Sequence, residues 1–219
     1  MAESFNNSIR KILITIRDNP QILHTCDPVI VTKLQSQGKP NSQATSNAVT
    51  IQEGAFASLL EANGFQFLSK PKKNDHLKGI TSGLVTNGFY YIYQVNGSQQ
   101  SIDFQAMIIH DKKIEKFINF DLKHTTNDII FLNDGWFEDN VIYVVSWNTK
   151  TFVALGQNVP TDIDAELMKK VIALKKELNK NKEATKYLSV TMRCANRYSC
   201  KQFTPEFTAD CFTKVCNSL

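Results

Sequence analysis

The stretch from Ile102 to Lys123, IDFQAMIIHDKKIEKFINFDLK, places the strongest constraint on what this chain can fold into. Apolar and polar residues alternate along its first half and again after a turn expected at residues 110–113, which is the period of half-buried β-strands. The sequence therefore predicts an antiparallel hairpin that brings Asp103, Asp121 and Lys123 together. The residues expected to share the buried face of the first strand are Ile102, Phe104, Ala106 and Ile108.

Two carboxylates beside one amine have a recognisable chemistry. Carboxylate oxygens bind hard divalent cations such as Mg²⁺. An ammonium group positions a water molecule or offsets charge on a phosphoryl oxygen. The same three residues are equally consistent with ordinary surface charges on a hairpin, so their positions alone leave both interpretations open.

The order of these residues resembles a nuclease motif. Asp103, a spacer, and then Asp121, Leu122 and Lys123 at the end of an apolar strand are similar to the PD-(D/E)xK pattern. Ile102 stands where that motif has proline, and Asp121 where it more often has glutamate. Downstream, the segment HTTNDIIFLNDGWF and the apolar run VIYVVSW resemble the part of many type II restriction endonucleases that follows the catalytic lysine.

This resemblance, which extends over roughly residues 53–147, implies a fold and an activity. The fold is α/β, with a restriction-endonuclease-like core in which helices flank a central mixed β-sheet. The activity is Mg²⁺-dependent hydrolysis of both strands of double-stranded DNA at a short, palindromic sequence, by a homodimer with one active site per strand. Asp103 and Asp121 would hold the metal, and Lys123 would orient or help deprotonate the attacking water.

Other functions fit parts of the same pattern. A DNA repair or recombination nuclease of the same superfamily would use the same residues. In a non-catalytic nucleic-acid-binding module, basic segments would bind phosphates while Asp103 and Asp121 merely end their strands. A glycosidase also uses two carboxylates, but the nearby Lys123 and the nuclease-like context disfavour it.

The helix expected from about Ala44 to Asn63 carries two further acidic candidates. Its sequence EGAFASLLEANGF resembles the helix that precedes the catalytic sheet in restriction endonucleases, where a glutamate often approaches the metal. Glu53 is the preferred candidate because it lies earlier and closer to the buried stripe, and Glu61 remains the alternative. Either could instead be a solvated surface charge. The buried stripe is expected to comprise Ala48, Ile51, Ala55, Phe56, Leu59 and Leu60.

Two groups of residues are candidate DNA contacts. Lys72 and Lys73 lie in a lysine-rich loop and are point charges suited to phosphates. Arginine and asparagine carry forked donors and acceptors that read base edges, which favours the segment 193–201. Its candidates are Arg193, Asn196, Arg197 and Lys201, with Asn133 and Asp134 as the next choice. Solubility, or a basic loop with a structural role, explains the same residues, and the net charge of +4 is only a mild excess.

A chain of 219 residues fits one domain. We expect a helical N-terminal segment (1–40), a catalytic core (41–182) and a C-terminal segment assigned to DNA recognition (183–219). Further helices are predicted before Asn19-Pro20, at about 162–180 and from Thr204 onward. Further strands are predicted at 88–95, 141–147 and 188–192.

Several classes of protein are disfavoured. No apolar run approaches the roughly 20 residues that span a bilayer, and the N-terminus does not resemble a signal peptide, so a cytoplasmic protein is expected. The sequence contains no phosphate-binding loop, no GxGxxG turn and no GxSxG elbow. Its five cysteines predict reduced thiols, and the C-terminal four lack the close pairs of a typical zinc site.

Overall fold

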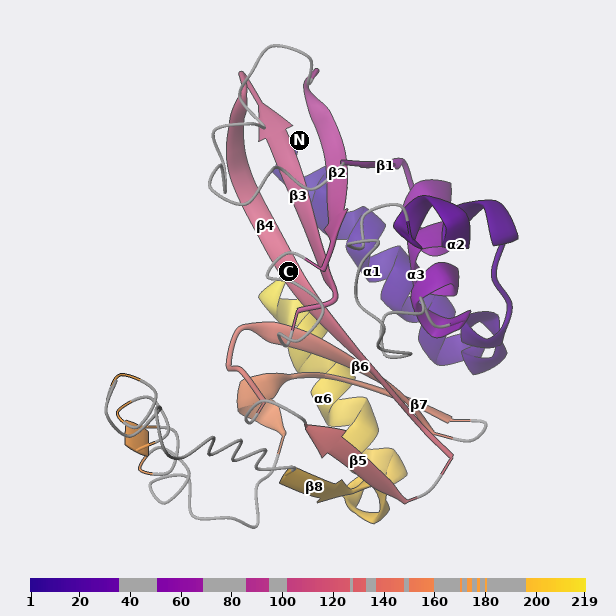
Figure 1. Cartoon of the computed structure of the whole chain (residues 1–219), viewed down its shortest axis with the longest axis vertical. Helices are drawn as coiled ribbons and strands as arrows, with labels where there is room; N and C mark the ends of the chain where they lie inside the picture. The colour runs from indigo at the N-terminus through magenta and orange to yellow at the C-terminus, as the bar shows by residue number, and fades with distance from the viewer. Residues whose placement is uncertain are drawn as a thin grey trace.

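The computed structural model describes residues 1–35, 51–68, 86–94, 102–126, 128–132, 137–147, 150–159 and 196–219, together with isolated positions between 170 and 180. Its centre is a mixed sheet of six strands in the order β1-β2-β3-β4-β6-β7, flanked by helices (Figure 1). The α/β class and the mixed central sheet expected from the sequence are therefore confirmed. None of the described helices is long and apolar enough to cross a membrane.

The six strands contain both kinds of pairing. They are β1 (Phe65–Phe67), β2 (Gly88–Tyr93), β3 (Phe104–His110), β4 (Lys113–Thr125), β6 (Val141–Trp147) and β7 (Lys150–Leu155). Strands β1 and β2 are parallel, as are β4 and β6, whereas the other neighbours are antiparallel. A separate antiparallel pair consists of β5 (Ile129–Leu132) and β8 (Asn196–Ser199). The predicted strands at 88–95 and 141–147 are present, whereas β1, β5, β7 and β8 were not predicted.

Strands β3 and β4 form the predicted hairpin. Asp111 and Lys112 at its turn have φ angles of 48° and 62°, and two consecutive positive φ angles match the type I′ turn that suits twisted strands. Strand β3 pairs with β4 only as far as Phe104, which lies opposite Phe120. On its other side, β4 pairs with β6 over residues 119–125. Strand β4 thus joins an antiparallel half of the sheet to a parallel half.

In the described part of the chain, four helical segments precede the sheet strands, and the longest helix after the sheet is close to the C-terminus. They are α1 (Ala2–Asp18), η1 (Pro20–His24), α2 (Pro28–Gln35), α3 (Ile51–Ala62) and α6 (Pro205–Ser218). Helix α1 ends before Pro20 as predicted, since proline cannot continue the hydrogen-bonding pattern of a helix. Helix α6 begins after Thr204, whose hydroxyl accepts the Phe207 N–H at 3.3 Å. The helix predicted at 162–180 lies almost entirely outside the described residues, and the strand predicted at 188–192 lies wholly outside them.

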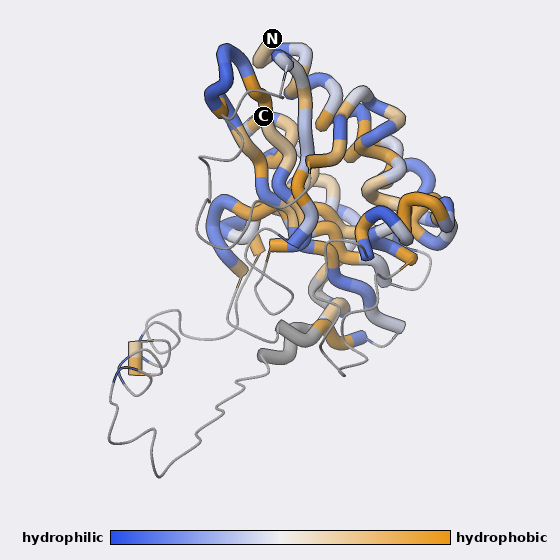
Figure 2. The backbone as a smooth tube through the Cα atoms, turned by 45° about the horizontal axis from the view of Figure 1, so that its top comes forward, coloured by the Kyte–Doolittle hydropathy of each residue, from blue (hydrophilic) through white to orange (hydrophobic). Residues whose placement is uncertain are grey.

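Two larger hydrophobic clusters lie on opposite faces of the sheet, and Figure 2 shows hydrophobic segments gathered where the helices meet the strands. Phe120 and Leu122 of β4 belong to the cluster beneath α1 and α3. Tyr143 of β6 belongs to the opposite cluster, which includes residues of α6. Ile102 also lies in that opposite cluster, so the prediction that it shares a face with Phe104 was wrong. The chain bends at Asp103 before β3 begins, and the alternation does not extend through the bend.

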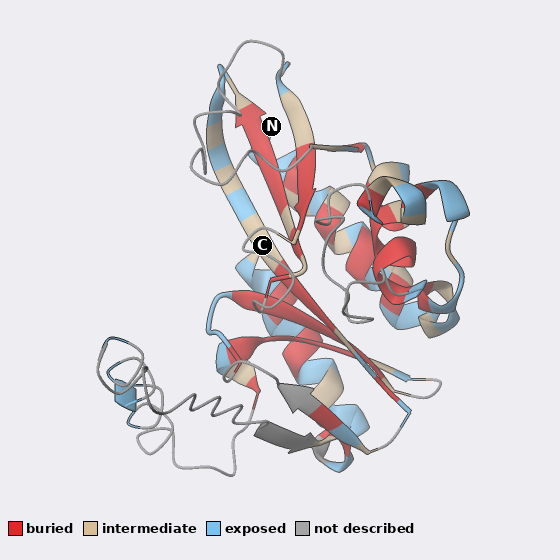
Figure 3. Ribbon diagram, viewed as in Figure 1, coloured by how far each residue is buried: buried red, intermediate tan, exposed pale blue. Residues whose placement is uncertain are grey.

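The degree of burial changes along β4. Residues 113–119 are exposed or half-buried, whereas Phe120, Asp121 and Leu122 are buried (Figure 3). The buried half is the part that β6 covers on one edge. The candidate carboxylate Asp121 therefore lies in the interior of the sheet and not on a solvated hairpin.

Candidate active site

Asp103 is attached to β4 through both its backbone and its side chain. Its backbone N–H donates to the Phe120 carbonyl at 2.9 Å. Its Oδ2 accepts the Leu122 backbone N–H at 2.7 Å. Because β3 starts only at Phe104, the carboxylate of Asp103 takes the place of the next ladder hydrogen bond, and this interaction explains the bend that redirects Ile102.

Asp121 and Lys123 form an ion pair on one face of β4. They are two residues apart, so their side chains point to the same side of the strand. Lys123 Nζ donates to Asp121 Oδ1 at 2.7 Å. The Asp121 side chain is 1% exposed, whereas that of Lys123 is 23% exposed. The pair therefore extends from the interior of the sheet to solvent.

Asp121 is a buried carboxyl with an unsatisfied oxygen. Its Oδ2 has no hydrogen-bond partner among the residues that the structure describes. Burial raises the pKa of Asp121 well above its ordinary value, and the Lys123 ammonium opposes this shift. The adjacent Asp103 carboxyl adds to the shift through its charge and through a side-chain hydrogen bond in which the two carboxyls share a proton. Buried polar atoms are rarely left unpaired in native proteins, and an unpaired one calls for an explanation such as a shared proton or a bound cation.

Tyr143 borders the same site from β6, where it lies opposite Asp121 in the parallel register. Its hydroxyl accepts the Glu138 backbone N–H at 2.8 Å. Burial raises the pKa of the Tyr143 phenol, and the negative charges of Asp121, Glu138 and Asp103 add to the shift. The phenol therefore stays protonated beside the carboxylates. Sequence analysis missed this role because the run VIYVVSW was interpreted only as a buried strand.

Glu53 lies on α3, which packs on the face of the sheet that carries Phe120 and Leu122, opposite to the face that carries Asp121 and Lys123. It is 9% exposed, and its Oε1 accepts a hydrogen bond from the Tyr93 hydroxyl at 2.9 Å. Burial raises the pKa of Tyr93, and the charges of both Glu53 and Asp103 contribute. Tyr93 therefore lies within electrostatic reach of both carboxylates and links α3 to the start of β3.

Glu61 lies two turns further along α3 and has different partners. Its Oε1 accepts a hydrogen bond from Lys33 of α2 and another from the Tyr91 hydroxyl at 2.6 Å. These contacts give Glu61 a role in packing α2 and α3 against β2. Of the two acidic candidates of this helix, Glu53 is the one whose hydrogen-bond partner, Tyr93, has a pKa that the charge of Asp103 also raises.

Gln52 is a buried residue of the site that the sequence analysis did not select. Its Nε2 donates to the Ser146 hydroxyl at 3.0 Å, and to the carbonyls of Lys123 at 3.3 Å and Val144 at 3.4 Å. One amide thus ties the first turn of α3 to the ends of β4 and β6. The prediction that Ile51 lies in the buried stripe was wrong, since Ile51 is 58% exposed and Gln52 takes the inward position. The signal was present in the sequence, because Gln52 stands four residues before Phe56.

The candidate DNA contacts are only partly described. Lys72, Lys73, Asn133, Asp134 and Arg193 lie outside the described residues. Asn196 and Arg197 belong to β8, so this part of the segment 193–201 is a strand and not the loop expected from the sequence. Asn196 lies opposite Leu132 of β5. Lys201 is exposed and lies 3.6 Å from the carboxylate of Asp128.

Strands β5 and β8 pair with each other although they are far apart in the sequence. Residue 132 is the last of β5, and the NDGWF stretch begins at residue 133. The first residue of β8 lies opposite residue 132. More than 60 residues separate the two strands in the chain.

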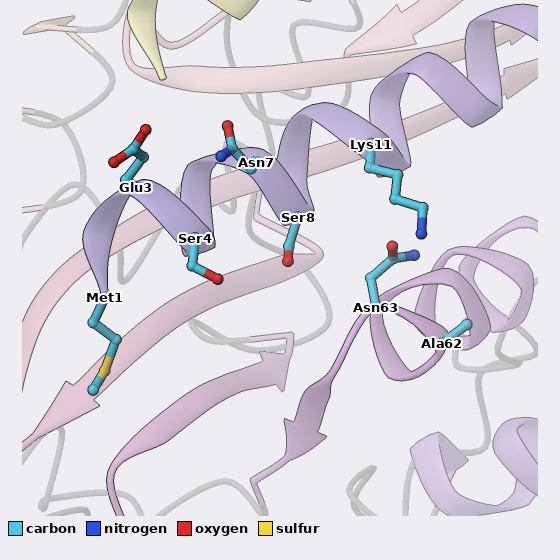
Figure 4. A pocket seen from close by; sticks show the side chains of 8 residues that line it. All are labelled: Met1, Glu3, Ser4, Asn7, Ser8, Lys11, Ala62 and Asn63. Atoms are coloured by element: carbon cyan, nitrogen blue, oxygen red, sulfur yellow. The ribbon is translucent and has the colours of Figure 1, made fainter.

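Two surface hollows accompany this arrangement. One, of about 530 Å³, is lined by Phe117, Asn119, Glu138, Asp139, Asn140 and Val141. The other, of about 600 Å³, lies between α1 and the end of α3, where Ser4, Ser8, Lys11 and Asn63 border it (Figure 4). Only the first hollow includes residues of β4, and it therefore adjoins the candidate site.

No larger metal-binding group is found in the part of the chain that the structure describes. Among those residues, no cluster of three or more His, Cys, Asp and Glu side chains has the spacing to hold a metal ion. Cys26, Cys200, Cys211 and Cys216 are free thiols.

Comparison of the chain with family models, with curated proteins and with solved structures gives no match. The function is therefore inferred from the site itself.

Proposed function

We propose that this protein is a Mg²⁺-dependent DNA endonuclease with a restriction-endonuclease-like core. One observation carries the proposal: Asp103, Asp121 and Lys123 meet at the junction of β3 and β4, with one oxygen of Asp121 buried and unpaired. A structural ion pair would account for the contact between Asp121 and Lys123. The hydrogen bond that Asp103 accepts from the Leu122 N–H accounts for one of its oxygens. It does not account for a second negative charge beside the pair, which disfavours ionisation of Asp121.

The residues present fit a magnesium ion. Mg²⁺ is commonly bound in nucleotide-processing sites through one or two carboxylates, with water and substrate phosphate completing its coordination. Asp103 and Asp121 would supply those carboxylates, and the unpaired Oδ2 of Asp121 is an available acceptor. A bound Mg²⁺ would stabilise charge on the phosphoryl oxygens and lower the pKa of a water molecule.

The protein's own groups supply the remaining functions. Lys123 reaches solvent and holds Asp121 Oδ1, so its ammonium is positioned to orient a water molecule beside the carboxylates. The Leu122 N–H fixes the orientation of Asp103. Gln52 holds the Lys123 carbonyl and thereby the end of the strand. Hydrolysis at this site would leave a 5′-phosphate and a 3′-hydroxyl, as the resemblance to restriction endonucleases implies.

Incubation with supercoiled plasmid tests the proposal directly. We expect linear fragments with discrete ends in Mg²⁺, and intact plasmid when EDTA removes the metal. Sequencing of the fragment ends would reveal the recognition sequence. A protein that retards plasmid on a gel but leaves it intact in Mg²⁺ would instead be a nucleic-acid-binding module, and the endonuclease proposal would be rejected.

We further propose that the active protein is a homodimer acting on palindromic double-stranded DNA in the cytoplasm. A single site of this kind cuts one strand, and two-fold symmetry supplies a second site for the other strand. Light scattering of the complex with a cleavable duplex tests this part. Two protein chains per duplex are expected, and a complex containing one chain would contradict the dimer.

The two glutamates of α3 provide a matched comparison. Replacement of Glu53 by glutamine should lower the cleavage rate by about tenfold to a hundredfold, because the charge beside Tyr93 and Asp103 is lost. Replacement of Glu61 by glutamine should change the cleavage rate by no more than about threefold. It should instead lower the stability of the protein, because the part-buried ion pair between Glu61 and Lys33 is lost. Initial cleavage rates and thermal melting of both variants distinguish these effects. Equal losses of cleavage in the two variants would remove Glu53 from the site.

A further inference from the structure

The face of β4 that carries Asp121 and Lys123 continues beyond them. Phe117 and Asn119 lie on the same face at successive two-residue steps. Phe117 is 55% exposed, although aromatic side chains are normally placed in contact with other apolar groups. This face thus presents an aromatic ring, an amide, and then the candidate catalytic pair in one line.

The hollow beside Phe117 has a preformed acidic wall. Glu138, Asp139 and Asn140 line one side of it, and Phe117 and Asn119 line the other. The wall is held in place because the Glu138 N–H donates to the Tyr143 hydroxyl at 2.8 Å, and its carbonyl accepts the Val141 N–H at 3.1 Å.

Two further contacts fix the hollow. A Cβ atom at Gly156 would lie only 2.1 Å from the Glu138 carbonyl oxygen, so glycine is required for this close approach. On the opposite side, Gln105 Nε2 donates to Asn119 Oδ1 at 2.9 Å, which sets the orientation of the Asn119 amide. The backbone of Glu138 and the side-chain amide of Asn119 are therefore positioned before any ligand binds.

The lining determines which part of a nucleic acid could enter. Of the lining residues that the structure describes, Asp139 is an exposed acidic residue and none is basic, which disfavours a phosphate group in the hollow. Carboxylates accept hydrogen bonds from exocyclic amino groups such as cytosine N4. An exposed aromatic ring provides a surface on which a base can stack. The combination favours a nucleobase that carries an amino group.

We propose that this hollow binds one unstacked nucleobase of the substrate strand, stacked on Phe117 and hydrogen-bonded through its amino group to the Asp139 carboxylate. This inference rests on the proposed function. Four residues of strand separate Phe117 from Asp121, a span of about 13 Å at roughly 3.3 Å per residue. At about 3.4 Å per nucleotide of a B-form strand, the base lies within roughly four nucleotides of the bond that is cut.

Binding without metal tests the inference apart from cleavage. Fluorescently labelled single-stranded oligo(dC) and oligo(dT) are titrated in EDTA with the full chain and with its Phe117→Ala variant. We expect the wild-type protein to bind oligo(dC) several-fold more tightly, because thymine has no exocyclic amino group. Phe117→Ala should weaken binding of both oligonucleotides by about tenfold, the loss of one stacking contact. Val29→Ala, at a 72% exposed apolar residue of α2, serves as the control and should change neither.

The acidic wall has a separate readout. Asp139→Ala should bring the ratio of the oligo(dC) affinity to the oligo(dT) affinity close to one. If Asp139 acted only by electrostatic repulsion, its removal would strengthen both affinities and leave their ratio unchanged.

Equal affinities of wild type, Phe117→Ala and Val29→Ala would overturn the inference even if plasmid is cut. Loss of affinity in Phe117→Ala with an uncut plasmid would instead support the base-binding hollow and reject the nuclease. Melting curves that match the wild type establish that each variant is folded.

Discussion

Replacing Asp121 by asparagine is expected to abolish DNA cleavage while leaving the protein folded. The substitution preserves the shape of the side chain but removes the charge that Lys123 contacts at 2.7 Å. It also weakens the group proposed to bind Mg²⁺. We expect the rate of plasmid cleavage to fall by about a hundredfold to ten-thousandfold, the range typical for loss of a group that handles protons or charge at the reacting centre.

The companion variant is Lys123→Ala, which should lose cleavage to a similar extent but keep its Mg²⁺-dependent affinity for DNA, since both carboxylates remain. Asp111→Asn is the matched control, because Asp111 lies in the turn of the same hairpin and its side chain is 79% exposed. Initial rates on supercoiled plasmid at fixed Mg²⁺ provide the measurement. Wild-type cleavage by Asp121→Asn would rule out the assigned site.

The second large effect concerns stability. The pKa of Asp121 is raised in the folded protein by burial, so the folded state binds this proton more tightly than the unfolded state does. The stability contributed by the protonated carboxyl is fully present below the ordinary pKa of about 4 and is lost as pH rises through the higher pKa of the folded state. The contribution of Asp121 to the free energy of unfolding of the wild type should therefore decrease as the pH rises from mildly acidic values.

The amide introduced by Asp121→Asn does not ionise. The stability of this variant should therefore not fall with rising pH in the way expected for the wild type. At neutral pH, we expect the variant to exceed the wild type in free energy of unfolding, because an ionised carboxylate is costly to bury and the neutral amide avoids that cost. The difference in free energy of unfolding between the two proteins should shrink at acidic pH, where the wild-type carboxyl is protonated. Addition of Mg²⁺ should also reduce this difference at neutral pH, because a ligand that binds only the folded wild type stabilises the wild type.

Chemical denaturation across the pH range, with and without Mg²⁺, measures these differences. Asp111→Asn again serves as the control and should follow the wild type, since the Asp111 side chain is exposed. If the wild type and Asp121→Asn lose stability in parallel as pH rises, the buried carboxyl is not responsible. A variant less stable than the wild type at neutral pH would mean that the ion pair with Lys123 outweighs burial.

The parts of the site that the sequence revealed are those with local causes. The hairpin was predictable because period-two alternation and a turn are visible within about 20 consecutive residues. Asp103, Asp121 and Lys123 lie within that window, so pairing of its two strands was enough to bring them together. Ile102 was misplaced because the side chain of Asp103 replaces a backbone partner, and alternation cannot indicate such a substitution.

The parts that were missed depend on contacts between distant segments. Gln52 reaches the Lys123 carbonyl across 71 positions, and Tyr93 reaches Glu53 across 40. Their roles arise only when α3 packs on the sheet. Strands β5 and β8 are each four residues long and pair across a long stretch of chain, so neither has a strong pattern of its own. In both cases tertiary packing decides what the local sequence leaves open.

The two halves of β4 also differ in how they can assemble as the chain folds. The first half pairs with β3 across a tight turn, a local contact of the kind that forms early, whereas parallel pairing with β6 requires a longer loop to close. Asp121 loses its contact with water only when β6 and Tyr143 dock beside it. We therefore expect a partly folded chain to hold a hydrated, ordinary aspartate at this position. The unusual carboxyl, and any activity that depends on it, would emerge only at the last stage of folding.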